Sequence, residues 1–252
     1  MTMRLTIIET GLPPVAIRDQ YPGGYPLMFE DLFRRVAPDM TFETVALEKG
    51  DELPDPESLE AILITGSAYG VYDDVPWMPA LKDWIGFAAE NSVPMIGICF
   101  GHQVIADALG GDVRKAVEKG WGLGRHTYQI AQKPYWMTPQ AETFSVGVSH
   151  QDQVLSTPPD AEILAGNDFA PHAALIYRRA PIISFQCHPE FSDEFLSNLY
   201  QARKGNPLTD AQVEAAEDSF VVPDDNELVA RWMVSFLKNE RSRTSRQVVS
   251  RA

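Results

Sequence analysis

At the centre of the chain stands the stretch Met95-Ile96-Gly97-Ile98-Cys99-Phe100-Gly101-His102-Gln103-Val104-Ile105-Ala106. Its apolar first part favours a buried strand, which passes through Gly-x-Cys-x-Gly into a segment with helical character. This pattern predicts a nucleophile elbow, a tight turn from strand to helix with a cysteine at its tip. Glycine is expected at 97 and 101, because so tight a turn leaves no room for side chains two residues before and after the nucleophile.

Cys99 would then stand at the N-terminus of the helix that the turn opens. Unpaired backbone N–H groups and the helix dipole favour a thiolate there, and the N–H of Phe100 is placed to bind a tetrahedral oxyanion. Taken alone, the stretch fits a packing cysteine as well as a catalytic one, since unreactive cysteines are commonly buried. A general base elsewhere in the chain would favour the catalytic interpretation of this cysteine.

Such a base lies in a second stretch, Ile182-Ile183-Ser184-Phe185-Gln186-Cys187-His188-Pro189-Glu190-Phe191. A predicted strand ends in His-Pro-Glu, which puts His188 at the tip of the strand and Glu190 close enough to fix the tautomer of the ring. Cys99, His188 and Glu190 are therefore a candidate catalytic triad for acyl transfer. We expect no metal site from Cys99, His102, Cys187 and His188, because neighbouring strand residues point to opposite faces and separate Cys187 from His188.

The rest of the chain predicts an α/β fold. Short apolar runs at 5–8, 42–45, 61–64 and 94–98 alternate with segments of helical spacing at 26–36 and 78–90, which is typical of a parallel sheet covered by helices. Five further strands, at 121–130, 143–149, 161–165, 173–177 and 182–186, predict a meander on one edge of that sheet. Helices are expected at 194–204, 209–218 and 225–238, with Thr209 and Asp225 as N-caps.

Segments 97–103 and 188–190 resemble the two signature motifs of the class I (triad) glutamine amidotransferases. Their residues are most similar to those of the amidotransferase domain of GMP synthase. The resemblance runs from about residue 4 to residue 195 and implies a flavodoxin-like fold, an open and mostly parallel sheet with helices on both faces. It divides the chain into an amidotransferase-like domain, 1–195, and a C-terminal helical extension and tail, 196–252. It also implies hydrolysis of a γ-glutamyl amide to glutamate and an amine, through a γ-glutamyl thioester on Cys99 and without a cofactor.

The same resemblance implies where the oxyanion is bound. Gly66 and Ser67 occupy the place of the Gly-rich oxyanion strand of the family, and the N–H of Phe100 is the second expected donor. The family often has two glycines around a proline in this loop, whereas this chain has Gly66-Ser67-Ala68. The backbone N–H that completes the oxyanion hole is therefore left open.

The substrate pocket is likewise implied by resemblance. Ser149 and His150 match the Ser-His-x-Asp segment that lines the glutamine pocket, and Gln103 would touch the α-amino and α-carboxyl end of the substrate. The loops at 69–77 and 135–138 match nothing in the family signatures, and we expect them to select the leaving group.

Two enzymatic functions remain open at this point, beside a non-enzymatic alternative in which the chain is a metal-binding or degenerate regulatory domain. In GMP synthase an ATP pyrophosphatase domain follows the amidotransferase, and residues 196–252 are too few for one. The chain therefore resembles the stand-alone GMP-synthase-like subgroup, to which plant γ-glutamyl peptidases belong. It would be either a self-sufficient hydrolase of a γ-glutamyl amide or peptide, or a glutaminase subunit that delivers ammonia to a separate synthetase. A homodimer formed through the C-terminal helices is also left open.

The composition excludes several other classes of protein. The chain has 252 residues, 44% of them hydrophobic and 22% charged, which suits one main globular core. Its formal net charge of −14 would repel nucleic acid and anionic membranes, so the expected partner is a small-molecule substrate. Only two cysteines are present and no signal-peptide core is found, which predicts a cytoplasmic protein.

Overall fold

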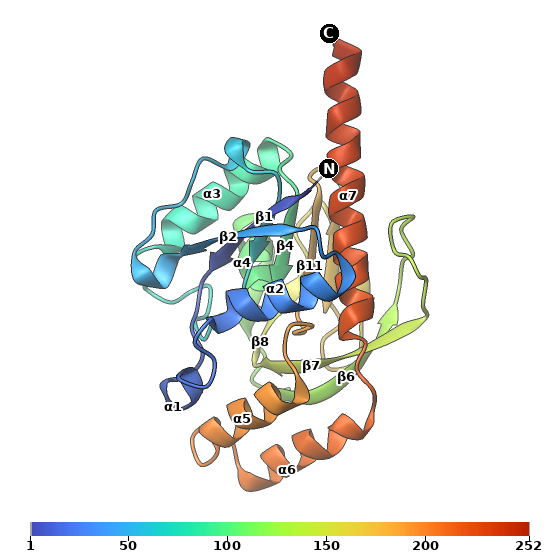
Figure 1. Cartoon of the computed structure of the whole chain (residues 1–252). Coiled ribbons are helices and arrows are strands. Elements are labelled where there is room, and N and C mark those ends of the chain that lie inside the picture. Colours follow the sequence, from blue (N-terminus) through green and yellow to red (C-terminus); the bar gives the residue numbers. More distant parts are fainter. Residues whose placement is uncertain (1, 252) are drawn as a thin grey trace.

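A sheet of nine strands runs through the part of the chain that the structure describes (Figure 1). The computed structural model describes residues 2–251, with side chains for residues 2–242. Five neighbouring strands are parallel and confirm the predicted apolar runs; in spatial order they are β2 (Thr41–Ala46), β1 (Arg4–Glu9), β3 (Ile62–Ile64), β4 (Met95–Ile98) and β11 (Ile182–Phe185).

The remaining strands continue the sheet in the antiparallel sense. Beyond β11 follow β10 (Ala174–Tyr177), β9 (Ala161–Gly166), β6 (Gly122–Ile130) and β7 (Thr143–His150). The predicted edge is therefore present, but only part of it is a meander. β9, β10 and β11 follow one another, whereas β6 and β7 form a hairpin that joins the sheet through the pairing of β6 with β9.

Two short strands were not predicted from the sequence. β5 (Asp112–Lys115) and β8 (Asp152–Ser156) pair in a separate antiparallel sheet, with Lys115 opposite Asp152. β5 is mostly charged and partly exposed, so it has no apolar run to reveal it. A single residue, Gln151, separates the end of β7 from the start of β8, and hydropathy alone does not distinguish the two strands.

Helices cover both faces of the large sheet, as the flavodoxin-like prediction requires. α2 (Gly24–Val36) and α7 (Asn226–Arg251) pack on one face, where Phe29, Phe33 and Trp232 belong to one hydrophobic cluster with the strands. α3 (Met78–Glu90) and α4 (Phe100–Ala108) pack on the other face, through Leu81 and Ile105. The predicted helix at 78–90 matches α3 residue for residue.

The helices that follow β11 do not form a single unit. α5 (Asp193–Arg203) and α6 (Asp210–Asp218) lie at one end of the molecule, against β6 and β7, while α7 crosses the sheet beside α2 (Figure 1). Thr209 caps α6 in a capping box with Gln212, which confirms the predicted cap. The carboxylate of Asp225, also predicted as a cap, accepts a hydrogen bond from the N–H of Ser145 in β7. The boundary at residue 195 stays a prediction, and so does the homodimer.

α7 is longer than the sequence analysis expected. It runs from Asn226 to Arg251, whereas the predicted helix ended at 238. In the described part of the chain, no helix is long and apolar enough to cross a membrane.

Candidate active site

The turn from β4 into α4 has the geometry of a nucleophile elbow. Cys99 has φ 52° and ψ −102°, a positive-φ conformation that a residue with a side chain rarely adopts. Its N–H donates to the carbonyl oxygen of Phe185 in β11 over 2.8 Å, and α4 begins at the next residue, Phe100. The first N–H groups of a helix have no partner within the helix, so the amide of Phe100 is available beside the thiol.

Both glycines of the elbow are required by close packing. A Cβ at Gly97 would lie 2.5 Å from the carbonyl oxygen of Gly101, and a Cβ at Gly101 would collide with the carbonyl oxygen of Ile64 in β3. α4 therefore approaches the sheet more closely than any side chain would allow. The predicted reason, lack of room within the turn, is confirmed for Gly97, whereas Gly101 is required by the close approach of α4 to β3.

The pairing of β11 with β4 brings the His-Pro-Glu segment next to the elbow. Phe185 lies opposite Ile98, and the chain then continues to His188, whose Nδ1–H donates to Oε1 of Glu190 over 2.7 Å. A Cβ at Gly66 would stand 2.8 Å from Cε1 of His188 and 3.6 Å from Cβ of Cys99. The cysteine and the histidine thus flank the same backbone position at the end of β3.

Burial and charge act in opposite directions on His188. The ring is buried, which disfavours its charged form. The negative charge of Glu190, followed by the influence of Cys99, outweighs this effect and raises the pKa of His188 to about 10. The ring also stacks on Phe191, with centroids 4.0 Å apart and planes at 8°. The imidazole is therefore held in one orientation with a strong preference for the protonated state.

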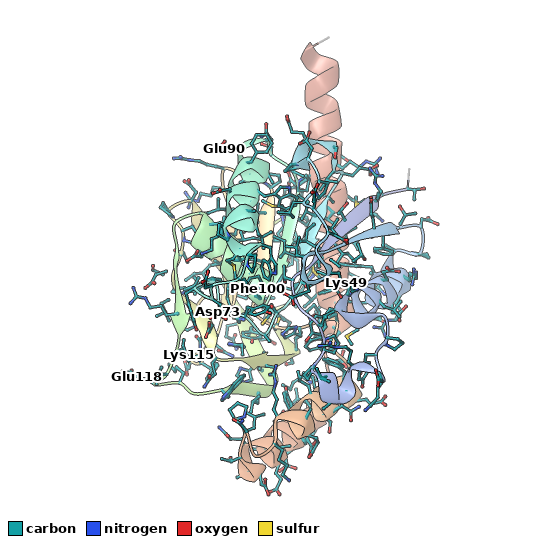
Figure 2. The ribbon with its side chains drawn as sticks, turned by 90° about the vertical axis from the view of Figure 1, so that its left-hand side faces the viewer. Lys49, Asp73, Glu90, Phe100, Lys115 and Glu118 are labelled. Carbon is teal, nitrogen blue, oxygen red and sulfur yellow. The ribbon has the colours of Figure 1, made fainter. Side chains whose placement is uncertain are left out.

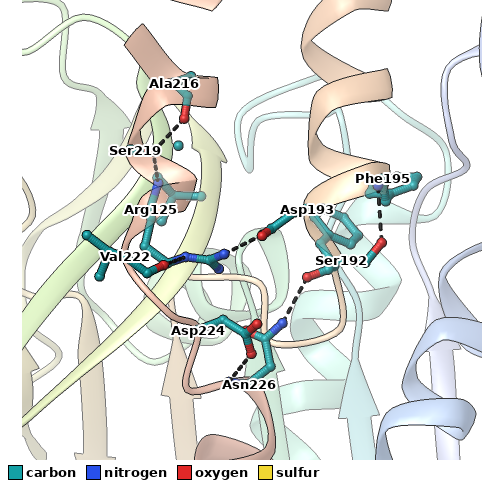
Figure 3. Close-up of polar contacts among 12 residues, drawn as sticks. Arg125, Ser192, Asp193, Phe195, Ala216, Ser219, Val222, Asp224 and Asn226 are labelled. Carbon is teal, nitrogen blue, oxygen red and sulfur yellow. Dashed lines mark hydrogen bonds and ion pairs between the residues drawn. The ribbon is translucent and has the colours of Figure 1, made fainter.

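A network of polar contacts anchors the chain just after Glu190 (Figure 3). The side chain of Asn226, at the start of α7, donates to the carbonyl oxygen of Phe191 over 2.9 Å. Ser192 caps α5 by accepting from the N–H of Phe195 over 3.1 Å. Arg125 from β6 donates to the carboxylate of Asp193 and, over 3.0 Å, to the carbonyl oxygen of Val222. Three separate elements therefore hold the loop that carries the carboxylate.

A pocket of about 280 Å³ opens at Cys99. Among the predicted site residues, its walls include Ser67, Cys99, Gln103, Ser149 and His150. Further walls come from the loop 68–73 and from Lys115, Trp121, Asp152 and Arg203. In Figure 2, Asp73 and Lys115 follow one another below Phe100, which marks the start of α4. The pocket is therefore framed by parts of the chain that are far apart in sequence.

The elbow with its buried histidine and carboxylate agrees with the comparison to known families. The family model described as "Glutamine amidotransferase class-I" matches residues 40–198. This chain belongs to the class I glutamine amidotransferases. Within that family, the chain is similar both to a GMP synthase subunit and to a gamma-glutamyl peptidase.

The glutamine-hydrolysing GMP synthase subunit of Sulfolobus acidocaldarius is 30% identical over 148 residues, which cover 59% of this amidotransferase and 76% of that protein. Gamma-glutamyl peptidase 2 of Arabidopsis thaliana is 28% identical over 193 residues, which cover 75% of this chain and 77% of that protein. The crystal structure of a glutamine amidotransferase from Thermotoga maritima superposes with a TM-score of 0.69 at 18% identity, over 95% of this chain and 97% of the other. The last comparison supports the flavodoxin-like fold.

Two glutamines of this amidotransferase form a chain of hydrogen bonds that ends at the sulfur of Cys99. Nε2 of Gln103 donates to the carbonyl oxygen of Asp152 over 2.9 Å and to Oε1 of Gln186 over 3.1 Å. Nε2 of Gln186 in turn donates to the sulfur of Cys99 over 3.6 Å. The amide nitrogen of Gln103 is thus engaged within the protein, and its contact with substrate stays a prediction. Gln186 was missed, although it lies in the stretch that supplied His188.

The side chains of two other predicted site residues also have partners within the protein. The hydroxyl of Ser67 donates to the carbonyl oxygen of Thr10 over 2.7 Å and accepts from the N–H of Tyr69 over 3.2 Å. Nδ1 of His150 lies 3.0 Å from the carbonyl oxygen of Asp152, and burial lowers the pKa of His150 to about 3. His150 is therefore neutral near pH 7, and both residues shape the pocket by fixing its backbone.

The expectation for the loop 135–138 is wrong. Trp136 packs on Phe236 of α7 with ring centroids 5.4 Å apart, and the loop borders a different hollow with Ser92 and Pro181. Those two residues precede β4 and β11, so the loop lies at the end of the sheet opposite to Cys99. The error arose because the direction of a loop depends on which strands pair, and the sequence leaves that pairing open. The loop 69–77 does contribute to the pocket.

The side chains considered as zinc ligands have other contacts. Nδ1 of His102 lies 2.8 Å from the hydroxyl of Ser184, and burial lowers the pKa of this histidine to about 3. Cys187 packs in the hydrophobic cluster of the sheet. Within the described residues, no group of three or more His, Cys, Asp or Glu side chains is placed to hold a metal ion.

Proposed function

We propose that this amidotransferase hydrolyses the γ-glutamyl amide bond of glutamine, or of a γ-glutamyl amide or peptide, with Cys99, His188 and Glu190 as its triad. One observation carries the proposal. A strained cysteine at the start of α4 flanks the same backbone position as a histidine that is held by a buried carboxylate, and a pocket opens at the cysteine.

In the first half of the reaction, the sulfur of Cys99 attacks the δ-carbon of the γ-glutamyl group. The carbonyl oxygen becomes an oxyanion, which accepts hydrogen bonds from the N–H of Phe100 and from the backbone at Gly66 and Ser67. His188 gives its proton to the departing amine, and the C–N bond breaks. The amine leaves, and a γ-glutamyl thioester remains on Cys99.

In the second half, water hydrolyses the thioester. His188, now neutral, takes a proton from the water as its oxygen attacks the same carbon. The C–S bond breaks, glutamate leaves and the cysteine returns to its starting state. Glu190 keeps the ring oriented through both halves and stabilises its positive charge. We assign the binding of the glutamate portion to the walls formed by Gln103, Ser149 and His150.

The alternative is a glutaminase subunit that passes ammonia to a separate synthetase, and the likeness to the GMP synthase subunit of Sulfolobus acidocaldarius supports it. We favour the self-sufficient hydrolase, because the likeness to the γ-glutamyl peptidase extends over a larger share of the chain. The substrate in both cases is a small molecule. A reducing, cytoplasmic setting suits the two free cysteines, Cys99 and Cys187.

The test is glutamate release by the purified protein alone, on glutamine, γ-glutamyl alkylamides, γ-glutamyl dipeptides and glutathione. We expect turnover of at least one compound, and none by Cys99→Ala. Full activity in Cys99→Ser would contradict the assignment of the nucleophile. If a folded protein whose Cys99 still reacts with iodoacetamide releases no glutamate from any of these compounds, the synthetase-dependent alternative is favoured.

A further inference from the structure

Arg203, the last residue of α5, reaches into the pocket at Cys99. Its Nη1 donates to the hydroxyl of Ser149 over 2.8 Å, and its guanidinium carbon lies 5.5 Å from the centre of the Trp121 ring. The family model ends at residue 198, so this arginine comes from outside the matched segment. A helix that extends beyond the matched segment therefore contributes a cation to the site.

The charge of Arg203 has no carboxylate to balance it among the described residues. Other cations of this region do have one: Arg125 pairs with Asp193, and the ammonium of Lys204 lies 3.6 Å from the carboxylate of Asp210. Burial lowers the pKa of Arg203, and the nearby Tyr25 and Cys99 act in the opposite direction. A partly buried guanidinium keeps its charge and favours an anionic partner.

The other charged side chains of the pocket wall differ from Arg203 in their setting, and Lys115 among them is exposed. Lys115 lies opposite Asp152 across the β5–β8 ladder, and its positive charge lowers the pKa of Asp152 against the larger effect of burial, which raises it. The carboxylate of Asp73 accepts from the N–H of Gly70 over 2.8 Å. Arg203 is thus the partly buried cation of the pocket wall, with no carboxylate facing it among the described residues.

We propose that Arg203 binds a carboxylate of the substrate. The guanidinium offers parallel N–H donors that fit a carboxylate in two-point contact, and Trp121 and Ser149 hold its plane. The inference rests on the proposed function, since every γ-glutamyl compound carries an α-carboxylate and γ-glutamyl peptides carry a second one on the leaving group. α5 then forms part of the substrate site.

The experiment compares four compounds on the full-length protein. Glutamine, γ-glutamylmethylamide and γ-glutamylglycine all carry the α-carboxylate, γ-glutamylglycine alone carries a second carboxylate on its leaving group, and 4-aminobutanamide has none. We expect Arg203→Gln to lower kcat/KM by about 10- to 100-fold on the compounds whose carboxylate it binds, and to leave 4-aminobutanamide unchanged. Arg203→Lys should restore part of the loss, and Lys204→Gln, which removes a charge outside the pocket, should match the wild type.

The pattern of losses identifies the carboxylate. A loss shared by glutamine, γ-glutamylmethylamide and γ-glutamylglycine assigns Arg203 to the α-carboxylate, and a loss confined to γ-glutamylglycine assigns it to the leaving group. An equal loss on all four compounds, or a loss on none, overturns the proposal. A merely structural role of Arg203 would produce the equal loss.

A binding measurement separates this inference from the proposed function. The same four compounds are titrated calorimetrically into Cys99→Ala protein, with and without Arg203→Gln. If the wild-type protein alone hydrolyses none of these compounds, their self-sufficient hydrolysis is excluded, while the affinities still decide the role of Arg203. Selective weakening of the carboxylate-bearing ligands supports the inference, and equal affinities in the two proteins contradict it.

Discussion

Cys99 and Gly66 show how single residues carry the geometry of the site. Cys99 holds a positive-φ backbone conformation that costs on the order of 1–3 kcal/mol, and the surrounding strands and helix impose it. Gly66 faces His188 so closely that any side chain at this position must displace the ring or the strand. The site therefore depends on backbone positions as much as on reactive side chains.

Gly66→Ala tests this dependence. The new Cβ would lie 2.8 Å from Cε1 of His188, so we expect the ring to move and kcat to fall by about 100-fold. Gly86→Ala is the matched control, because no atom lies within 4 Å of a Cβ there. It should leave kcat unchanged and raise the free energy of unfolding by about 0.5–1 kcal/mol, since Gly86 lies inside α3. Unchanged kcat in Gly66→Ala would show that His188 is not held against this position.

Glu190→Gln tests the electrostatics of His188. Burial alone lowers the pKa of this histidine, and the carboxylate is the first of the groups that raise it to about 10. We expect the variant to shift the alkaline limb of the kcat/KM profile down by at least about one pH unit. We also expect kcat to fall by about 10²- to 10⁴-fold, because the ring loses its charged orienting partner. An alkaline limb that does not move would argue against control of His188 by Glu190.

At the scale of the element, α7 is part of the main core. Trp232 is fully buried in the cluster that joins α2 to the sheet, and its indole N–H donates to the carbonyl oxygen of Pro139 over 2.7 Å. At its start, α7 also holds the loop after Glu190 through Asn226. Removing or loosening this helix should therefore affect both stability and the site.

We expect Trp232→Ala to lower the free energy of unfolding by about 3–5 kcal/mol, because it leaves a large cavity and an unpaired carbonyl group. Lys238→Ala, at an exposed position of α7, should change it by no more than about 0.5 kcal/mol. Urea unfolding followed by circular dichroism measures both. A loss below about 1 kcal/mol in Trp232→Ala would make α7 an appendage, as the proposed boundary at residue 195 implies.

For the molecule as a whole, buried histidines link stability to pH in two windows. His102 and His150 have pKa values lowered by burial from 6.5 to about 3, so the unfolded chain binds protons more readily and stability falls as pH drops below 6.5. His188 has its pKa raised from 6.5 to about 10, so its contribution is complete below pH 6.5 and is lost as pH rises toward 10. Stability should therefore be greatest near pH 6.5.

The acid window gives a measurable slope. Between pH 4 and 6, each buried neutral histidine is expected to contribute up to about 1.4 kcal/mol per pH unit to the change in the free energy of unfolding. His102→Asn should reduce that slope by about this amount, whatever it does to stability at pH 7. Urea titrations at several pH values provide the test, and an unchanged slope would mean that His102 is protonated in the folded protein.

The sequence by itself determined the features that depend on neighbouring residues. The strand, turn and helix around Cys99, the need for Gly97, and the apolar runs that form the parallel strands all follow from local periodicity and steric limits. The cap at Thr209 follows from the same kind of rule. These features were predictable because a few consecutive residues contain all the forces that produce them.

Only the tertiary structure decided which distant residues meet. The pairing of β11 with β4 sets Gln186 against Cys99, and the packing of α5 on β7 brings Arg203 to Ser149. The loop 135–138 was assigned to the wrong end of the sheet for the same reason. Contacts between distant segments arise when elements bury their apolar faces together, and local hydropathy shows that a face will be buried without showing against what.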